Sequence, residues 1–138
     1  MLERTLCVLV AHTELMNLTL RKVQAVAYLA QAKGVNLGLH FWYDLDGPWS
    51  KRLSEAIHAG EMSGLVAVDA LGHLKTSASC PFVLAANQPS DVDLQLAEVL
   101  LGLVTQKNLC QKATRHYRRV LEAAEAEKRG GKQKCPTQ

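Results

Sequence analysis

Leu18-Thr-Leu-Arg-Lys-Val-Gln-Ala-Val-Ala-Tyr-Leu-Ala-Gln31 is the stretch that decides the fold of this chain. Its apolar residues recur at three- and four-residue intervals, which predicts an amphipathic helix over about 19–33. Thr19 is a suitable N-terminal cap, and Gly34 stands where helices commonly end. We expect the stripe that faces the core to consist of Leu20, Val23, Ala27 and Ala30, widened by Val26 and Leu29.

The period changes to two in the next segment, 39–45, and aromatic residues alternate there with others. This pattern predicts a strand with one buried face, which Gly47-Pro48 then breaks. Ser50 can cap a third helix over about 50–62, and residues 64–77 predict a hairpin of two short strands. The buried face of the first strand is Leu39, Phe41, Tyr43 and Leu45, and its other face is His40, Trp42 and Asp44.

The flanks of this region are also mainly helical by pattern. Apolar residues in 2–16 lean to one side and predict a helix. Residues 79–89 contain two prolines and predict an irregular connection. The sequence Ser-Asp-Val-Asp at 90–93 has the form of a capping box, with acids in the first turn where the helix dipole favours them.

A heptad-like apolar seam continues from there to the C-terminal region. It predicts one long helix or two helices over 90–128, with a break near Gly102 or Asn108. A second apolar face predicts that the first half is buried, and the polar tail 129–138 is expected to be disordered. The seam is Val92, Leu96, Val99, Leu103, Gln106, Cys110, Ala113, Tyr117, Val120 and Ala124, and the second face is Leu94, Ala97, Leu101 and Val104.

Composition indicates one soluble domain over 1–128, with its core in 2–78. The chain has 138 residues, of which 48% are apolar and 21% charged, values typical of globular proteins. No apolar run approaches the roughly 20 residues of a membrane span, and the stretch Leu6 to Ala11 is a poor signal peptide. The four cysteines, Cys7, Cys80, Cys110 and Cys135, lack the spacing of a disulfide framework or a zinc site. We therefore expect mostly buried thiols in a reducing cytoplasm.

Charge is distributed unevenly along the chain. Residues 105–138 carry nine Lys or Arg against three Glu, a net charge of +6, and residues 1–104 carry seven against ten Asp or Glu, a net charge of −3. A basic C-terminal third can attract nucleic acid or an acidic protein surface. A solvated, soluble helix end is the other interpretation of the same charges.

Sequence motifs for catalysis, cofactors or metals are missing. There is no P-loop and no Gly-x-Gly-x-x-Gly, the turn at 44–47 does not continue as a calcium loop, and the five histidines are dispersed. We therefore predict a protein that is not an enzyme and has no cofactor, metal ion or small-molecule ligand. An enzyme site assembled in the fold from separated residues such as His40, Asp44 and His58 is a third alternative.

A helix that leads into a small β-ribbon is the plan of winged-helix domains, which commonly bind nucleic acid. In such a domain a helix can enter the major groove while a basic residue of the ribbon touches phosphate. The mixed charges of helix 50–62, which include Glu55, fit an ordinary solvated face as well. The candidate phosphate-contacting residues are Lys51, Arg52 and Lys75 on the third helix and hairpin, and Arg115, Arg118 and Arg119, which share one side of the C-terminal helix.

The segment Arg21-Lys-Val-Gln-Ala-Val-Ala-Tyr-Leu-Ala-Gln31, followed by 41–50 and Leu53, resembles the YwgA-type family of small, largely uncharacterised bacterial and archaeal proteins. More distantly it is similar to the Panacea (SocA-like) domain of antitoxins. The resemblance covers about 2–78 and implies a mainly helical, winged-helix-like fold; the Panacea domain implies neutralisation of a toxin by protein contact. Residues in register are Val23-Gln24, Tyr28, Gln31, Gly47-Pro48, Ser50, Leu53 and Gly64, and departures are Ala25, Asp46 and Trp49.

The sequence thus predicts an α+β, mainly helical, winged-helix-like domain with a small hairpin and one or two long C-terminal helices. Its leading predicted function is non-enzymatic binding of nucleic acid, DNA first, as in a transcriptional regulator. The alternative is a protein–protein interaction module, antitoxin-like or adaptor-like, that dimerises through the C-terminal helix.

Overall fold

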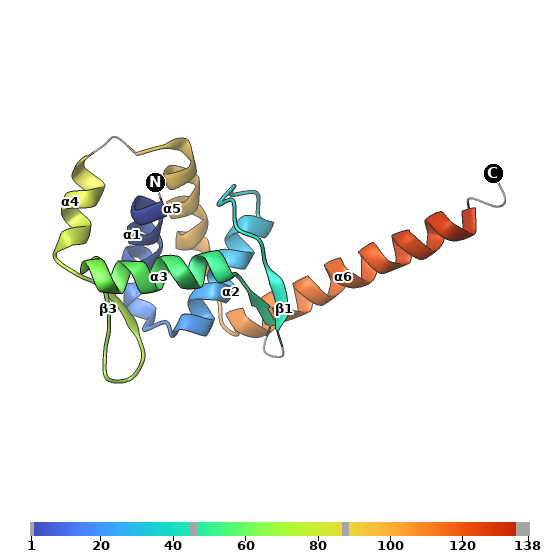
Figure 1. Cartoon of the computed structure of the whole chain (residues 1–138), viewed down its shortest axis with the longest axis horizontal. Helices are drawn as coiled ribbons and strands as arrows, with labels where there is room; N and C mark the ends of the chain where they lie inside the picture. The colour runs from blue at the N-terminus through green and yellow to red at the C-terminus, as the bar shows by residue number, and fades with distance from the viewer. Residues whose placement is uncertain (1, 45–46, 87–88, 135–138) are drawn as a thin grey trace.

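The computed structural model describes residues 2–44, 47–86 and 89–134. It is a mainly helical α+β fold with small antiparallel hairpins and a long C-terminal helix (Figure 1). The predicted fold class is therefore confirmed. Within the described ranges the α-helices are α1 (Leu2–Thr13), α2 (Leu20–Ala32), α3 (Lys51–Ser63), α4 (Ser79–Ala86), α5 (Asp91–Leu103) and α6 (Leu109–Lys134).

Two hairpins flank α3. The second, β3 (Val66–Val68) with β4 (Leu74–Thr76), follows α3 as the sequence predicts. The first is a correction, because the expected strand 39–45 is shortened to β1 (Trp42–Asp44) and pairs with a new strand, β2 (Gly47–Trp49). Pro48 does not prevent the pairing, because an edge strand needs no amide donor on its free side.

The core forms around α1 and α2. Helix α1 packs against α3, α4 and α5, while α2 packs against α5, α6 and β2. The predicted stripe of α2 is largely correct, since Val23, Ala27 and Ala30 are fully buried. Leu20 at the start of α2 is the exception, because its side chain lies at the surface.

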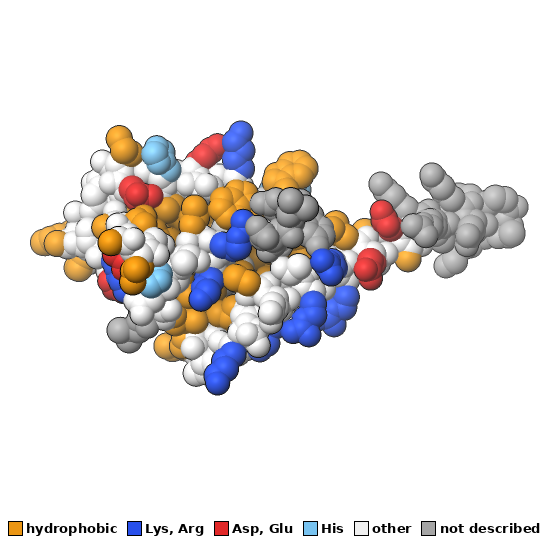
Figure 2. Space-filling model, turned by 90° about the horizontal axis from the view of Figure 1, so that it is seen from below, with side chains coloured by type: hydrophobic (Ala, Val, Ile, Leu, Met, Phe, Trp, Pro, Cys, Tyr) orange, Lys and Arg blue, Asp and Glu red, His pale blue; other side chains and the backbone are white. Residues whose placement is uncertain are grey.

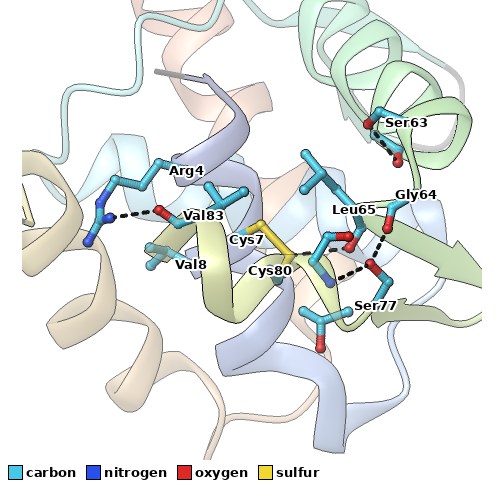
Figure 3. The surroundings of a disulfide bond; sticks show 12 residues. Arg4, Cys7, Val8, Ser63, Gly64, Leu65, Ser77, Cys80 and Val83 are labelled. Atoms are coloured by element: carbon cyan, nitrogen blue, oxygen red, sulfur yellow. Dashed lines mark hydrogen bonds between the residues drawn. A yellow bond between two sulfur atoms is a disulfide. The ribbon is translucent and has the colours of Figure 1, made fainter. Parts of the chain in front are cut away.

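A disulfide joins α1 to α4 and corrects two predictions. Residues 79–86 form a helix where an irregular connection was expected, and Cys7 of α1 is bonded to Cys80 of α4, with a Cα–Cα distance of 5.6 Å (Figure 3). Both cysteines are buried as expected, but they are not thiols. Disulfides persist mainly in oxidising compartments, and the cytoplasmic location inferred from the cysteine spacing stays a prediction.

The C-terminal region consists of two helices. The predicted capping box at Ser90 and Asp93 opens α5. The two helices are separated by a short connection that ends at Asn108, which has a left-handed φ of 60°. The expected second buried face is wrong, because Leu94 and Leu101 are 56% and 62% exposed. Instead α5 buries the face that carries Leu96, Leu100 and Leu103.

Helix α6 leaves the body of the molecule. Its first turns pack against α2 and β2, and the remainder projects away from the other elements (Figure 1). All residues from 118 to 127 are exposed. The helix continues to Lys134, past residue 128 where the sequence predicted its end, and residues 135–138 lie outside the described part of the chain.

Candidate nucleic-acid interface

The six predicted phosphate-contacting residues fall into separate groups. Lys51 and Arg52 open α3, whereas Lys75 lies on β4, whose partner β3 packs against α3. Figure 1 places this second hairpin at one end of α3 and β1 near the other end. A helix of this length spans about 20 Å, so the fold does not bring the ribbon cation and the helix cations together.

The cations of the third helix and hairpin make contacts within the protein. Lys75 donates from Nζ to the carbonyl oxygen of Glu14 at 3.3 Å and to Oδ1 of Asn17 at 2.5 Å. Arg52 donates to the carbonyl oxygen of Gly38 at 3.3 Å. Lys51 is highly exposed and lies 3.9 Å from a carboxylate oxygen of Glu55.

The outer face of α3 is also unfavourable for phosphate. A shallow hollow there is lined by Glu55, His58 and Glu61, together with Leu20. Two carboxylates on one helical face repel a polyanion. The two carboxylates make this face of α3 unfavourable for phosphate contact, and the recognition-helix interpretation stays a prediction.

The first half of α6 is held firmly against α2. Leu109 and Ala113 are buried, and the Tyr28 hydroxyl lies 2.8 Å from Nδ1 of His116. The hydroxyl of Tyr117 donates to the carbonyl oxygen of Phe41 at 2.7 Å. Burial of the Tyr28 side chain is the main cause that raises its pKa above the usual value. The electrostatic interaction with Tyr117 raises the pKa further. The opposite face of α6 is consequently fixed toward solvent.

Two adjoining hollows of about 510 and 450 Å³, one at the junction of α2 with α6 and one along α6, share Cys110 and Gln111. We call the pair the cationic groove. Polar side chains form much of its lining, and none of the described lining residues is Asp or Glu. The lining residues are Met16, Leu18, Lys22, Gln106, Lys107, Asn108, Leu109, Cys110, Gln111, Thr114, Arg115 and Arg118.

The electrostatics of the cationic groove are dominated by positive charge. Burial raises the pKa of the Cys110 thiol, whereas the nearby cations Lys22 and Arg21 act in the opposite direction. Arg21 also lies over the ring of Trp49, 5.4 Å from its centroid. Figure 2, which views the molecule from below, shows Lys and Arg side chains gathered in the lower centre, with acidic side chains nearer the margins.

Two residues of the groove, Lys22 and Lys107, were not among the predicted site residues. Lys22 lies in the first turn of α2 and Lys107 in the connection before α6. Lys107 is close to α6 along the chain, whereas Lys22 reaches the groove only through the packing of α2 against α6. The sequence signal that could have suggested Lys107 is the absence of acidic residues from 99 to 121, whereas no sequence signal points to Lys22.

The residues of the alternative enzyme site do not form a shared site in the described structure. His40 packs edge-on against Trp42, with ring centroids 4.5 Å apart, and His58 lines the hollow on α3. The side chain of Asp44 lies outside the described atoms. Among the described residues, no three His, Cys, Asp or Glu side chains are grouped in a way that could hold a metal ion.

The described helices include none with the length and apolar character to span a membrane. No protein-family model, curated protein or solved structure matches the chain. The resemblance to YwgA-type and Panacea proteins therefore stays a prediction from the residues themselves.

Proposed function

We propose that this protein binds nucleic acid, DNA first, through the cationic groove between the start of α2 and the first half of α6. The observation that supports the proposal is the grouping of Lys22, Lys107, Arg115 and Arg118 around polar side chains, with no acidic residue among the described lining. The proposal keeps the predicted function and the predicted residues Arg115 and Arg118, adds Lys22 and Lys107, and leaves Lys51, Arg52, Lys75 and Arg119 outside the groove.

Groups of three kinds in this groove favour a phosphate backbone. Lys and Arg neutralise phosphates and release their counterions, which supplies most sequence-independent affinity. Gln106 and Gln111 offer neutral donors of the sort that also contact phosphate and sugar oxygens. The first turn of α6 lies in the groove as well, and the positive end of the helix dipole adds to the potential there.

The length of the groove suits a linear polyanion better than a single phosphate group. Between Lys107 and Arg118 the rise of a helix would cover about 16 Å. One strand of a duplex advances about 3.4 Å per phosphate along its axis, so roughly four phosphates fit along this line. This match favours a nucleic-acid backbone over a small anionic ligand.

Fluorescence anisotropy with a labelled 20-base-pair duplex and a 20-nucleotide single strand tests the proposal. Contacts with about four phosphates predict a slope of roughly −3.6 for log K against log salt with the duplex, so tripling the salt concentration weakens binding about 50-fold. No binding of either probe at 50 mM salt and 100 µM protein would overturn the proposal.

A matched pair of triple variants locates the site. Lys22→Gln/Lys107→Gln/Arg115→Gln removes three groove cations and should reduce the magnitude of the salt slope by about 3, that is, about 1 per cation. The control Lys33→Gln/Lys51→Gln/Arg52→Gln removes the same charge from exposed positions outside the groove. If only the control weakens binding, the site lies on α3 as first predicted and the groove is excluded.

A further inference from the structure

We propose that the projecting half of α6 pairs with the same segment of a second copy of this chain, in antiparallel orientation and centred on Leu121. This inference does not require nucleic-acid binding, and it stands mainly on the part of α6 beyond the cationic groove, with Arg118 common to both. It specifies the occupant, orientation and register of a helix face that the rest of the described chain leaves uncovered.

The projecting half carries an apolar stripe that continues the buried face of α6. Ala113 and Tyr117 pack on the body, and Val120, Leu121 and Ala124 follow at helical spacing on the same side. Val120 and Leu121 remain 47% and 37% exposed. A helix without tertiary contacts is only marginally stable in water, so this stripe favours a helical partner.

The charges on either side of Leu121 are of opposite sign. The segment 109–120 contains four Lys or Arg and no acidic residue, whereas the segment 122–127 contains three glutamates and no Lys or Arg. A partner that brings glutamates to the first segment and cations to the second therefore complements both. The same segment of a second copy, laid in the opposite direction, meets both requirements.

Orientation follows from the positions of these charges. In an antiparallel pair centred on Leu121, Arg118 lies three residues before the centre and comes beside Glu125, four residues after it, on the second copy. Both residues occupy the same border of the apolar stripe, seven positions apart. In a parallel, in-register pair the two copies of each residue would lie level but on opposite sides of the seam, so Arg118 of one copy would not come beside Glu125 of the other. Charge complementarity therefore selects the antiparallel arrangement.

The expected affinity is modest. About three helical turns per copy, 117–127, can take part, which is a smaller contact than the roughly 1,200 Å² of a stable interface. We expect a dissociation constant in the micromolar range, so the dimer should form on concentration and dissociate on dilution. Light scattering across a 1–500 µM series measures this equilibrium.

Three variants test the charge pairing. Arg118→Glu and Glu125→Arg should each weaken association at least tenfold, because each places like charges side by side. The double variant Arg118→Glu/Glu125→Arg should restore association to near the original value, since the attraction is rebuilt with the signs exchanged. A double variant as weak as the single variants would overturn the pairing of these two residues. A monomer at 500 µM for the unmodified chain would overturn the whole proposal.

Disulfide trapping tests the orientation in a Cys110→Ser/Cys135→Ser background. Leu121→Cys should form a dimer on mild oxidation, whereas Ala124→Cys should not, because antiparallel packing offsets residue 124 from its counterpart by about 9 Å along the axis. That offset exceeds the roughly 7 Å Cα separation that a disulfide tolerates. Equal trapping at both positions would show a parallel pair and refute the antiparallel one. Thermal melts of each variant confirm that the body remains folded.

Discussion

Two glutamine side chains on α2 bond to the backbone on either side of the β1–β2 hairpin, at Leu39 and Ser50. Nε2 of Gln24 donates to the carbonyl oxygen of Ser50 at 2.9 Å, and its Oε1 accepts from the Ser50 amide at 2.8 Å. Gln31 makes the same pair of bonds with Leu39, at 2.8 and 3.1 Å. An amide side chain offers one donor and one acceptor, so each glutamine satisfies both backbone groups of one residue.

Gln24→Ala should cost about 2–3 kcal/mol of unfolding free energy. The substitution leaves the buried amide of Ser50 without its acceptor and opens a small cavity. The Ser50 carbonyl keeps its bond from the amide of Ser54 at 3.1 Å, which limits the loss. Gln31→Ala should cost about 1 kcal/mol, because Gln31 is only half-buried and water can replace its bonds. Urea unfolding measures both, and an equal loss at the two positions would contradict this account.

In the sequence, only the resemblance to the YwgA-type family draws attention to Gln24 and Gln31. Gln24 and Gln31 are part of the pattern shared with the YwgA-type family, yet their spacing of seven residues places two polar side chains on the apolar side of α2. Nothing in that pattern specifies Ser50 and Leu39 as their partners. The partners depend on how the chain between them returns across α2, which is a tertiary feature.

At the scale of elements, α4 shows where local signals mislead. Cys80-Pro81-Phe82 suggested a loop, but a proline in the first turn of a helix removes an amide that has no intrahelical partner anyway. The apolar face of α4 is not periodic, because Phe82 is 76% exposed beside the buried Cys80. The anchor of α4 is the bond to Cys7, 73 residues away, and no local pattern encodes such a pairing.

Breaking the Cys7–Cys80 disulfide should destabilise the fold by about 4 kcal/mol. The bond closes a loop of 73 residues, and the chain-entropy relation gives a loss of this size for such a loop. Urea unfolding of Cys7→Ser/Cys80→Ser measures it, and Cys110→Ser serves as the control because Cys110 is a half-buried free thiol. Alkylation in denaturant without reductant should leave Cys7 and Cys80 unmodified; their full modification would restore the thiol prediction.

The docking of the β1–β2 hairpin on α6 depends on Gly47. Its φ of 123° disfavours any side chain, and a Cβ there would collide with the Oγ1 of Thr114. Gly47→Ala should cost about 1–3 kcal/mol. Adding Thr114→Ser should not rescue stability, since it keeps the oxygen and the backbone strain remains. Thermal unfolding measures both, and stability equal to that of the unmodified chain would show that the hairpin does not rest on α6.

Most helices and the second hairpin could be predicted because their signals are local. Thr19, Ser50 and Ser90 each cap the helix expected from them, with the hydroxyl accepting from a backbone amide of the first turn. The candidate site could be predicted only in part. Arg115 and Arg118 are neighbours along one helix, whereas Lys22 reaches the same groove only through the packing of α2 on α6.

For the whole molecule, the two proposals together predict that nucleic-acid affinity depends on probe length. A dimer carries two cationic grooves, and a duplex that spans both gains from their effective concentration. Leu121→Lys should abolish the dimer and weaken binding of a 40-base-pair duplex roughly tenfold, with little effect on a 12-base-pair duplex. Anisotropy titrations compare the two probes, and equal loss on both would show that Leu121 acts on the groove itself.

The departure of α6 from the body also governs how the molecule moves through solution. The 26 residues of α6 measure about 39 Å along their axis, and the segment from residue 118 onward projects from the body (Figure 1). A projecting helix raises the frictional coefficient of the molecule. The monomer should therefore migrate in gel filtration and sediment like an elongated particle. Elution volume alone would thus overstate its mass and imitate a dimer.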